Sequence, residues 1–398
     1  MSENNTNAKL DYSLIFIIIL LAIISVFTLY TLDPYLDQNP LFQNMYVKQI
    51  VWYIAGSIAI AVIMMFDYDR FRQVSWVLYG IGLISLIMLY FHFPPGIAHE
   101  VKGGAWGWFS FPGIGTIQPA EFMKVFLIIF LAHIMVAHNE KYPEHTIKMD
   151  LWLLCKIAIA ALVPIFFVAQ QPDLGGGVLV LSAISACMIL VSGIKWRIIL
   201  TIVGTVLLSF ITIIYVYLTY PDKVNEFLYD KDLGHVVARF QGWLFPDDYS
   251  QEGAYQTLNA MKAIGSGQLV GKGIGDFEMT YKIPEYHTDY IFSAIAEQFG
   301  FFGSSILILI FFLLIYRLIF IALKSKDPFA SYMVTGIIGM FTYQIFQNVG
   351  MSIQLLPVTG LPLPFIGYGG SSTLTYMIAI GIVLSVYYRI KTYMFDES

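Results

Sequence analysis

About ten apolar segments, each long enough to cross the hydrocarbon core of a bilayer as a helix, occupy most of this chain of 398 residues. Their cores lie near residues 14–32, 51–66, 76–93, 122–137, 151–169, 178–192, 196–218, 301–323, 332–351 and 374–388. Only 12% of the residues are charged and 58% are hydrophobic, whereas soluble domains carry about 25% charged residues. The sequence therefore predicts an all-α, polytopic integral membrane protein and excludes a soluble enzyme.

Lysine and arginine are distributed unevenly between the two sides of these spans. An even number of spans places both termini on one side, where thirteen of the 22 basic residues fall: Lys9, Arg70, Arg72, Lys141, Lys148, Lys156, Lys195, Arg197, Arg317, Lys324, Lys326, Arg389 and Lys391. The short loops of the opposite side hold only Lys48 and Lys102. Because cytoplasmic loops are enriched in basic residues, we expect a multi-pass cell-membrane protein with both termini in the cytoplasm.

The longest connection covers residues 219–290 and precedes the eighth span, on the outer side of the membrane. Long loops cross the membrane largely regardless of charge, so its six basic residues do not contradict the topology. A connection of this length is typically functional. A short amphipathic helix is predicted within it from four apolar residues at helical spacing and a terminating glycine: Tyr255, Leu258, Met261, Ile264 and Gly265. We treat residues 1–398 as one membrane domain that contains this loop.

The net charge and the cysteine content exclude further classes of protein. The net charge of −5 argues against a basic surface for nucleic acid. Two cysteines, Cys155 and Cys187, cannot form a disulfide framework and lack metal-ligand spacing. The seven histidines show no zinc pair on one helix face, and His287 is expected at the surface. No protein metal site is therefore predicted.

Ionisable residues at the ends of the spans are the first candidates for function, because a charge in hydrocarbon is costly. Glu121 and Lys124 enter the fourth span three residues apart, so on a helix they share a face and can pair. Asp173 follows Pro172 at the start of the sixth span, where a carboxylate can cap free helix amides. A structural ion pair and a helix cap are the alternatives to a functional role for these residues.

A third group lies where the long loop re-enters the membrane. Asp289 immediately precedes an apolar run, with Glu297 on a later turn, so its carboxylate faces a partly desolvated environment. Desolvation raises the pKa of a carboxylate towards the range of a general base, and a nearby lysine lowers it. The alternative role for Asp289 is an N-cap of the following helix.

Two glycine-rich stretches complete the candidates. Residues 356–372 contain three prolines and four glycines, so their backbone groups must line a cavity or be buried in protein. Residues 265–275 are similar to a phosphate-binding loop but lack the P-loop spacing. Free amides there, together with Lys272, would still suit the pyrophosphate of a lipid carrier.

Together these stretches resemble the SEDS family (shape, elongation, division and sporulation) of peptidoglycan glycosyltransferases. The matching motifs lie at residues 104–124, 171–175, 255–256, 271–273, 284–289, 348–351 and 369–372, and the resemblance runs from about residue 11 to residue 391. Ala120 and Gly367 stand where serine is usual in the family. Residues 121–124 and 348–351 are more similar to RodA, the elongation enzyme, than to FtsW, the division enzyme.

The resemblance implies polymerisation of lipid II at the outer face of the membrane, with inversion at the anomeric carbon. It implies that Asp289 is the general base, that Lys124 tunes it, and that Glu121 holds Lys124. Further contacts with the sugar, lipid or pyrophosphate are implied for Trp108, Asp173, Arg239, Gln256, Lys262, Lys272, His287, Thr288, Ser371 and Ser372. The resemblance leaves a place for a divalent cation, Mg²⁺ or Mn²⁺, requires no organic cofactor, and implies membrane lipids and a class B penicillin-binding protein, a transpeptidase, as partners.

Two other functions are compatible with parts of the pattern. A transporter or flippase of a lipid-linked precursor also uses broken helices and buried charges, but its site should lie near the bilayer midplane. Glu121, Asp173, Asp289 and Ser371 instead all map to the outer side. A non-catalytic scaffold for a cell-wall synthase is the third possibility, and the complete set of acid and base residues argues against it.

Overall fold

The computed structural model describes residues 10–36, 43–101, 105–111, 115–171, 174–229, 234–249 and 254–396. Nine helices among these residues are long and apolar enough to span a membrane. They are α1 (Tyr12–Leu32), α2 (Met45–Met65), α3 (Asp69–Tyr90), α4 (Pro119–Lys141), α5 (Ile147–Ala169), α7 (Trp196–Thr219), α11 (Ile291–Lys324), α12 (Pro328–Ser352) and α13 (Gly370–Asp396). The remaining expected span is the shorter α6 (Val180–Val191), preceded by a π-helical turn over Leu174–Leu179. The predicted fold class is confirmed.

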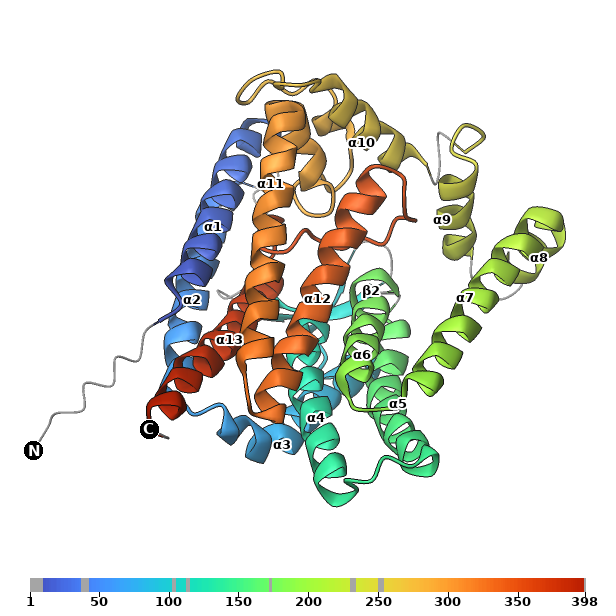
Figure 1. Ribbon diagram of the computed structural model, residues 1–398. Helices are drawn as coiled ribbons and strands as arrows, with labels where there is room; N and C mark the ends of the chain where they lie inside the picture. The colour runs from blue at the N-terminus through green and yellow to red at the C-terminus, as the bar shows by residue number, and fades with distance from the viewer. Residues whose placement is uncertain are drawn as a thin grey trace, which may run out of the picture.

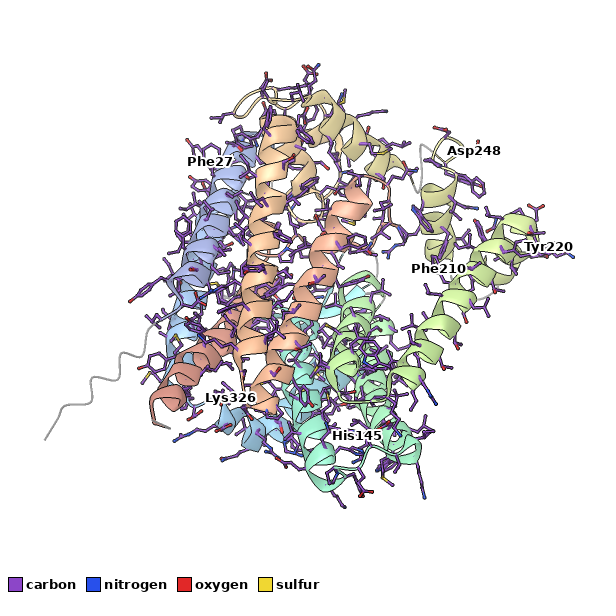
Figure 2. All side chains as sticks on the ribbon, in the orientation of Figure 1. Phe27, His145, Phe210, Tyr220, Asp248 and Lys326 are labelled. Atoms are coloured by element: carbon purple, nitrogen blue, oxygen red, sulfur yellow. The ribbon has the colours of Figure 1, made fainter. Side chains whose placement is uncertain are left out.

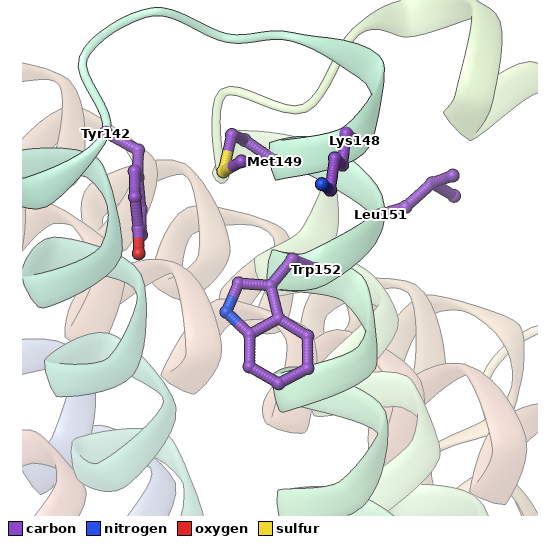
Figure 3. A pocket seen from close by; sticks show the side chains of 5 residues that line it. All are labelled: Tyr142, Lys148, Met149, Leu151 and Trp152. Atoms are coloured by element: carbon purple, nitrogen blue, oxygen red, sulfur yellow. The ribbon is translucent and has the colours of Figure 1, made fainter.

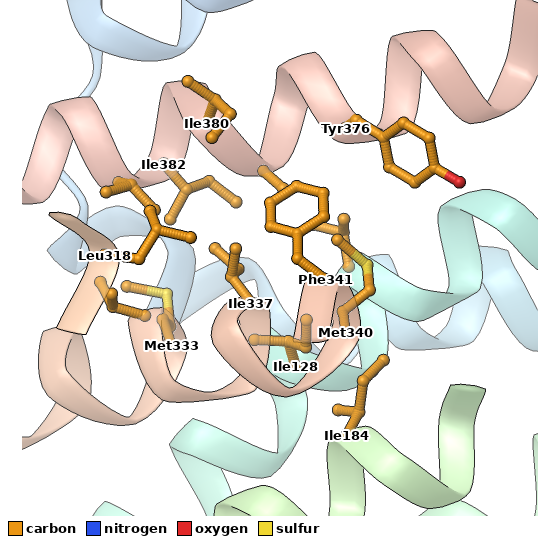
Figure 4. Close-up of a cluster of buried hydrophobic side chains, with 14 of the residues drawn as sticks. Ile128, Ile184, Leu318, Met333, Ile337, Met340, Phe341, Tyr376, Ile380 and Ile382 are labelled. Carbon is orange, nitrogen blue, oxygen red and sulfur yellow. The ribbon is translucent and has the colours of Figure 1, made fainter. Parts of the chain in front are cut away.

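Three helices form the centre of the bundle. In the most apolar stretch of α4, α12 and α13, 72%, 61% and 78% of the residues are buried, against 6% in α7. Figure 4 shows side chains from these three helices packed with Ile184 of α6 and Leu318 of α11. Helix α7 instead tilts away from the bundle (Figure 1). Residues of a candidate site on α4, α12 or α13 therefore lie on the most deeply buried helices of the bundle.

Local sequence signals set where several helices begin. Pro119 occupies the first turn of α4, where its missing amide hydrogen costs nothing. Asp327 caps α12 by accepting hydrogen bonds from the amides of Phe329 and Ala330. Thr146 caps α5 in the same manner. Asp11 precedes α1 and caps it by accepting a hydrogen bond from the amide of Leu14.

A small antiparallel sheet precedes α4. Its strands are β1 (Ala98–Val101), β2 (Ala105–Phe111) and β3 (Gly115–Ile117), in the order β1-β2-β3, with Phe109 opposite both Ala98 and Ile117. The sheet was not predicted from the sequence, because its strands are short and carry no long apolar run. Its last strand, β3, ends at Ile117, and α4 begins two residues later at Pro119.

The described residues of the connection over residues 219–290 form three α-helices: α8 (Pro221–Tyr229), α9 (Gly234–Leu244) and α10 (Tyr255–Ser266). The amphipathic helix predicted from the spacing of its apolar residues is confirmed as α10, whereas α8 and α9 were not predicted. Tyr220 and Asp248, beside α8 and α9, lie at the opposite end of the molecule from His145 and Lys326 (Figure 2). The long connection therefore covers one end of the bundle.

Helix α11 has a kink at Gly300, whose φ of 62° is in the left-handed region that favours glycine. The loop after α10 binds to this kink. The amides of Lys272 and Gly273 donate to the carbonyl oxygens of Glu297 and Gln298, at 2.9 and 3.2 Å. A side chain on Gly271 would overlap the Gln298 carbonyl oxygen. These glycines therefore serve a close backbone contact, and the expectation of free amides at Lys272 is wrong.

Candidate active site

Glu121 and Lys124 form a buried ion pair on the first two turns of α4, as their spacing predicted. Lys124 Nζ lies 2.7 Å from Glu121 Oε1, and the two side chains are 0% and 6% exposed. The second oxygen, Glu121 Oε2, is buried and has no hydrogen-bond partner among the described residues. One strong acceptor position is therefore left open next to the pair.

Asp289 lies in the turn before α11, and its surroundings come from two distant segments. Asn348 of α12, which is fully buried, donates through Nδ2 to the carbonyl oxygens of Asp289 and Leu361, each at 2.6 Å. A side-chain carbon at Gly360 would lie 3.4 Å from Asp289 Oδ2, so the carboxylate faces the backbone of that glycine. The helix begins at Ile291 with Tyr290 as its N-cap, so the alternative role of Asp289 as the cap is wrong.

The proline- and glycine-rich segment between α12 and α13 is held in place through its backbone. Ser25 and Tyr53 donate to the carbonyl oxygens of Ile366 and Phe365, the former at 2.8 Å. The amide of Tyr368 donates to the carbonyl oxygen of His287 at 3.0 Å. Side chains of α1 and α2 thus supply partners for backbone groups that no helix satisfies, and the segment is buried as expected.

Further contacts connect this segment to the start of α4. Ser371 Oγ accepts a hydrogen bond from the amide of Gln118 at 3.0 Å. The hydroxyl of Tyr376 lies within electrostatic range of both Glu121 and Asp289. Three of the four sequence-predicted groups, around Glu121, Asp289 and Ser371, are therefore brought together in space. Asp173 lies outside the described residues.

His287 and Arg239 flank the Asp289 turn. His287 is only 7% exposed, which contradicts the expected surface position, and burial lowers the pKa of its imidazole while Glu285 opposes that shift. Burial raises the pKa of Tyr290 to about 12, and Arg239 of α9 is close enough to lower it. Arg239 is therefore a cation near Tyr290, the residue that follows Asp289.

Lys272 is engaged away from these groups. Its ammonium pairs with Glu278 and lies 3.6 Å from Glu297 Oε1. Glu297 is fully buried and accepts hydrogen bonds from the amides of Glu278, Met279 and Thr280, each at 2.9 Å. This carboxylate fixes the loop that leads to Asp289, and Lys272 belongs to the same structural network.

The other predicted contacts are spread over the same end of the molecule. Trp108 lies on β2, and Gln256 and Lys262 lie on α10, with Lys262 exposed and the other two half-buried. Thr288 is half-buried beside Asp289, and its carbonyl oxygen lies against Gly367. Ser372 is buried in the first turn of α13 and donates to the Gly369 carbonyl oxygen at 3.2 Å. In the described structure, contacts connect Thr288 and Ser372 to the segments around Asp289, whereas Lys262 is exposed on α10.

Four buried polar residues at the site were not assigned roles from the sequence: Gln171, Glu297, Asn348 and Tyr376. Both side-chain amide atoms of Gln171 lack hydrogen-bond partners among the described residues, and its Oε1 faces Gly107 of β2. The sequence does mark these residues as candidates, because each is a polar residue in or beside a predicted membrane span. Their partners, however, are distant in sequence, so only the fold reveals their roles.

No group of three or more His, Cys, Asp or Glu side chains within the described ranges is placed to hold a metal ion. Magnesium can bind through one or two carboxylates together with substrate phosphates. At this site Asp289 is the carboxylate that could contribute to such an ion.

Comparisons with known proteins agree on one family. The family model FtsW/RodA/SpoVE, described as "Cell cycle protein", matches residues 11–392. A Bacillus subtilis protein named "Probable peptidoglycan glycosyltransferase FtsW" is 32% identical over 96% of this chain and 91% of its own length. "Stage V sporulation protein E" of the same organism is 31% identical over 94% and 96%.

Solved structures share the fold. A chain from a peptidoglycan synthase complex that coordinates polymerization and crosslinking has a TM-score of 0.74 and 25% identity, covering 96% of this chain and 98% of its own. The rod shape determining protein RodA of Thermus thermophilus has a TM-score of 0.64 and 24% identity, covering 95% and 96%.

Proposed function

Since the chain belongs to the FtsW/RodA/SpoVE family, we propose that it is a peptidoglycan glycosyltransferase that polymerises lipid II. The observation that carries the proposal is the convergence of one half-buried carboxylate, Asp289, with the buried Glu121–Lys124 pair and a proline- and glycine-rich segment. Such a set of charged groups at the end of tightly packed helices is costly to maintain in a membrane protein without a function.

In the proposed reaction Asp289 is the general base. It accepts the proton of an acceptor sugar hydroxyl while that oxygen bonds to the anomeric carbon of the donor. The bond from that carbon to the pyrophosphate oxygen breaks, and the carbon is inverted because attack comes from the face opposite the leaving group. General-base assistance contributes about 10²–10⁴-fold, so positioning and leaving-group stabilisation must supply the rest.

Lys124 and Arg239 are the cations that support this chemistry. Arg239, close to Tyr290, is placed to attract the departing pyrophosphate, for which a guanidinium is well suited. Lys124 supplies positive charge near the base and is held by Glu121. Lys272 is already engaged by two carboxylates, so we assign it to the loop structure. Mg²⁺ or Mn²⁺, if required, would be held largely by the substrate phosphates, and it would supply charge stabilisation of the leaving group.

The proposed location follows from charge. Of the thirteen basic residues that the sequence places on one side, those in the described ranges belong to the end of the bundle where α4 ends and α12 begins, so this end is assigned to the cytoplasm and the site to the outer face. A transpeptidase of the class B penicillin-binding proteins is the proposed partner, by analogy with the synthase complex that has the same fold. For the cellular role we propose elongation and shape; depletion should then produce rounded cells, whereas filaments would indicate division.

Incubation of the purified, full-length protein with lipid II in detergent, followed by gel separation of glycan strands, tests the function. Micelles have no two sides, so a transporter or flippase yields no product in this assay. We expect a ladder of strands from the protein alone or with its transpeptidase partner. If no strands form under either condition and the protein transports lipid II in vesicles, the protein is a transporter and the proposed enzymatic function is wrong.

A further inference from the structure

A pocket of about 450 Å³ lies between the end of α4 and the first turns of α5, at the opposite end of α4 from Glu121 and Lys124. Tyr142, Lys148, Met149, Leu151 and Trp152 line it. Figure 3 shows the rings of Tyr142 and Trp152 on two sides of the space, with Lys148 one turn of α5 before Trp152. The pocket therefore combines apolar walls with one ammonium group.

Two more lysines lie at its edges. Lys141 Nζ is 5.4 Å from the centre of the Tyr142 ring, and Lys156 Nζ is 5.5 Å from the centre of the Trp152 ring. Each ring carries a cation on its face, which orients the lysine stem along the pocket wall. Lys148 thus lines the cavity, while Lys141 and Lys156 each lie over a ring that lines it, and Lys156 Nζ also lies 3.2 Å from His138 Nδ1.

The acidic residues nearby do not cancel this charge. Glu140 is bound by Arg72 through both of its oxygens. Asp150 is buried and accepts hydrogen bonds from the His145 ring and from the amide of Lys195, each at 3.2 Å. Glu144 is the exposed acid of the connection between α4 and α5. The pocket therefore keeps a net positive charge.

The position of the pocket matches a lipid headgroup. It lies at the end of the bundle marked by His145 and Lys326 in Figure 2, where basic residues gather. Leu151 and Trp152 are about half exposed on the outer surface of α5, as expected for residues at the boundary between headgroups and acyl chains. Basic pockets between helices on the cytoplasmic side are suited to anionic lipids.

We propose that this pocket binds one anionic phospholipid, with its phosphate at Lys148 and an acyl chain along Leu151 and Trp152. Lys141 and Lys156 add long-range attraction, and the rings of Tyr142 and Trp152 hold the glycerol region. The site is independent of the proposed glycosyltransferase chemistry, since its lining residues lie at the opposite end of α4 from Glu121 and Lys124.

Native mass spectrometry of the full-length protein in a neutral detergent tests the proposal, with phosphatidylglycerol as the probe and phosphatidylcholine of the same chains as the neutral comparison. We expect phosphatidylglycerol to bind about tenfold more tightly, and Lys148→Ala to weaken it about fivefold. Trp152→Ala should weaken the binding of both lipids. Arg197→Ala, an exposed cation at the same end of the bundle but on α7, is the matched control and should change binding less than about twofold.

Equal affinity of Lys148→Ala and the unaltered protein for phosphatidylglycerol would overturn the proposal, as would equal affinity for the two lipids. Displacement of phosphatidylglycerol by an excess of inorganic phosphate would also overturn it, because the site would then recognise a soluble phosphate. Lys148 and Trp152 are exposed, so both variants should unfold at the temperature of the unaltered protein.

Discussion

Lys124 has no exposed surface, and its charge is compatible with this position because Glu121 Oε1 lies 2.7 Å from the ammonium nitrogen. Breaking a buried ion pair by removing one partner leaves an uncompensated charge and costs about 3–5 kcal/mol. Replacing both partners with neutral residues of similar size avoids that cost. The contribution of this pair to stability can therefore be measured separately from its contribution to catalysis.

Lys124→Met alone should destabilise the protein by about 3–5 kcal/mol, because Glu121 is left charged and buried. The double variant Glu121→Gln/Lys124→Met should recover most of the thermal stability but not strand synthesis. Thermal unfolding and the lipid II assay, run on the same preparations, measure both. A double variant with full activity would reduce the pair to a helix anchor.

His287 predicts a pH dependence. Its pKa in the folded protein is lowered by burial, so between that value and about 6.5 the unfolded chain binds the extra proton first. Stability from this residue is therefore complete above about pH 6.5 and is lost as the pH falls towards the folded pKa. His287→Asn should unfold with a shallower pH dependence than the unaltered protein in thermal scans across this range. Parallel curves would show that His287 makes no such contribution.

At the scale of elements, the loop after α10 depends on one residue of α11. Glu297 accepts three backbone amides and the Thr280 hydroxyl, the last at 2.5 Å, and pairs with Lys272. An amide in its place would present hydrogens to those amides and lose the attraction for Lys272. The loop is also held by the backbone hydrogen bonds at the Gly300 kink and by hydrogen bonds of Gly275 with Tyr35 and Gln298, but Glu297 is the acceptor for most of its bonds near Thr280.

Glu297→Gln should therefore expose Lys272 to trypsin. Loss of about 1.4 kcal/mol of local stability corresponds to about tenfold faster cleavage when the loop opens and closes quickly. Asp276→Asn, an exposed change in the same loop, should cleave at the rate of the unaltered protein. Identical rates for both variants would exclude the proposed role of Glu297.

Local sequence signals predicted the elements that such signals control. The apolar spans and α10 follow from the spacing of apolar residues, and the Glu121–Lys124 pair from the three-residue interval on a helix. The sheet before α4 and the helices α8 and α9 were missed, because short elements outside the bilayer carry no long apolar run. Asn348 and Glu297 were missed because they bind segments that the chain brings near only after folding.

For the whole molecule, the assigned topology can be measured directly. With Cys155→Ala and Cys187→Ala as background, Asp276→Cys should react with a membrane-impermeant maleimide on intact cells. Glu144→Cys, at the opposite end of the bundle, should react only after the membrane is permeabilised. The reverse pattern would place the termini outside and the candidate site inside.

The assembly of the site from α4, the turn before α11 and the segment before α13 is a property of the complete bundle. The Asp289 turn contacts Asn348 of α12 and Gly360, and the segment that holds Gly360 contacts the start of α4 through Ser371 and Gln118. An asparagine in place of Asp289 keeps the size of the side chain but cannot accept a proton as a carboxylate does.

Strand synthesis from lipid II by Asp289→Asn, compared with Asp276→Asn and the unaltered protein, tests the proposed role of Asp289 most directly. The Asp289 variant should lose at least about 10²-fold in rate while its thermal unfolding and its binding to the transpeptidase partner stay unchanged. Asp276→Asn should retain full activity. Strand synthesis by Asp289→Asn at the unaltered rate would contradict the assignment of Asp289 as the general base.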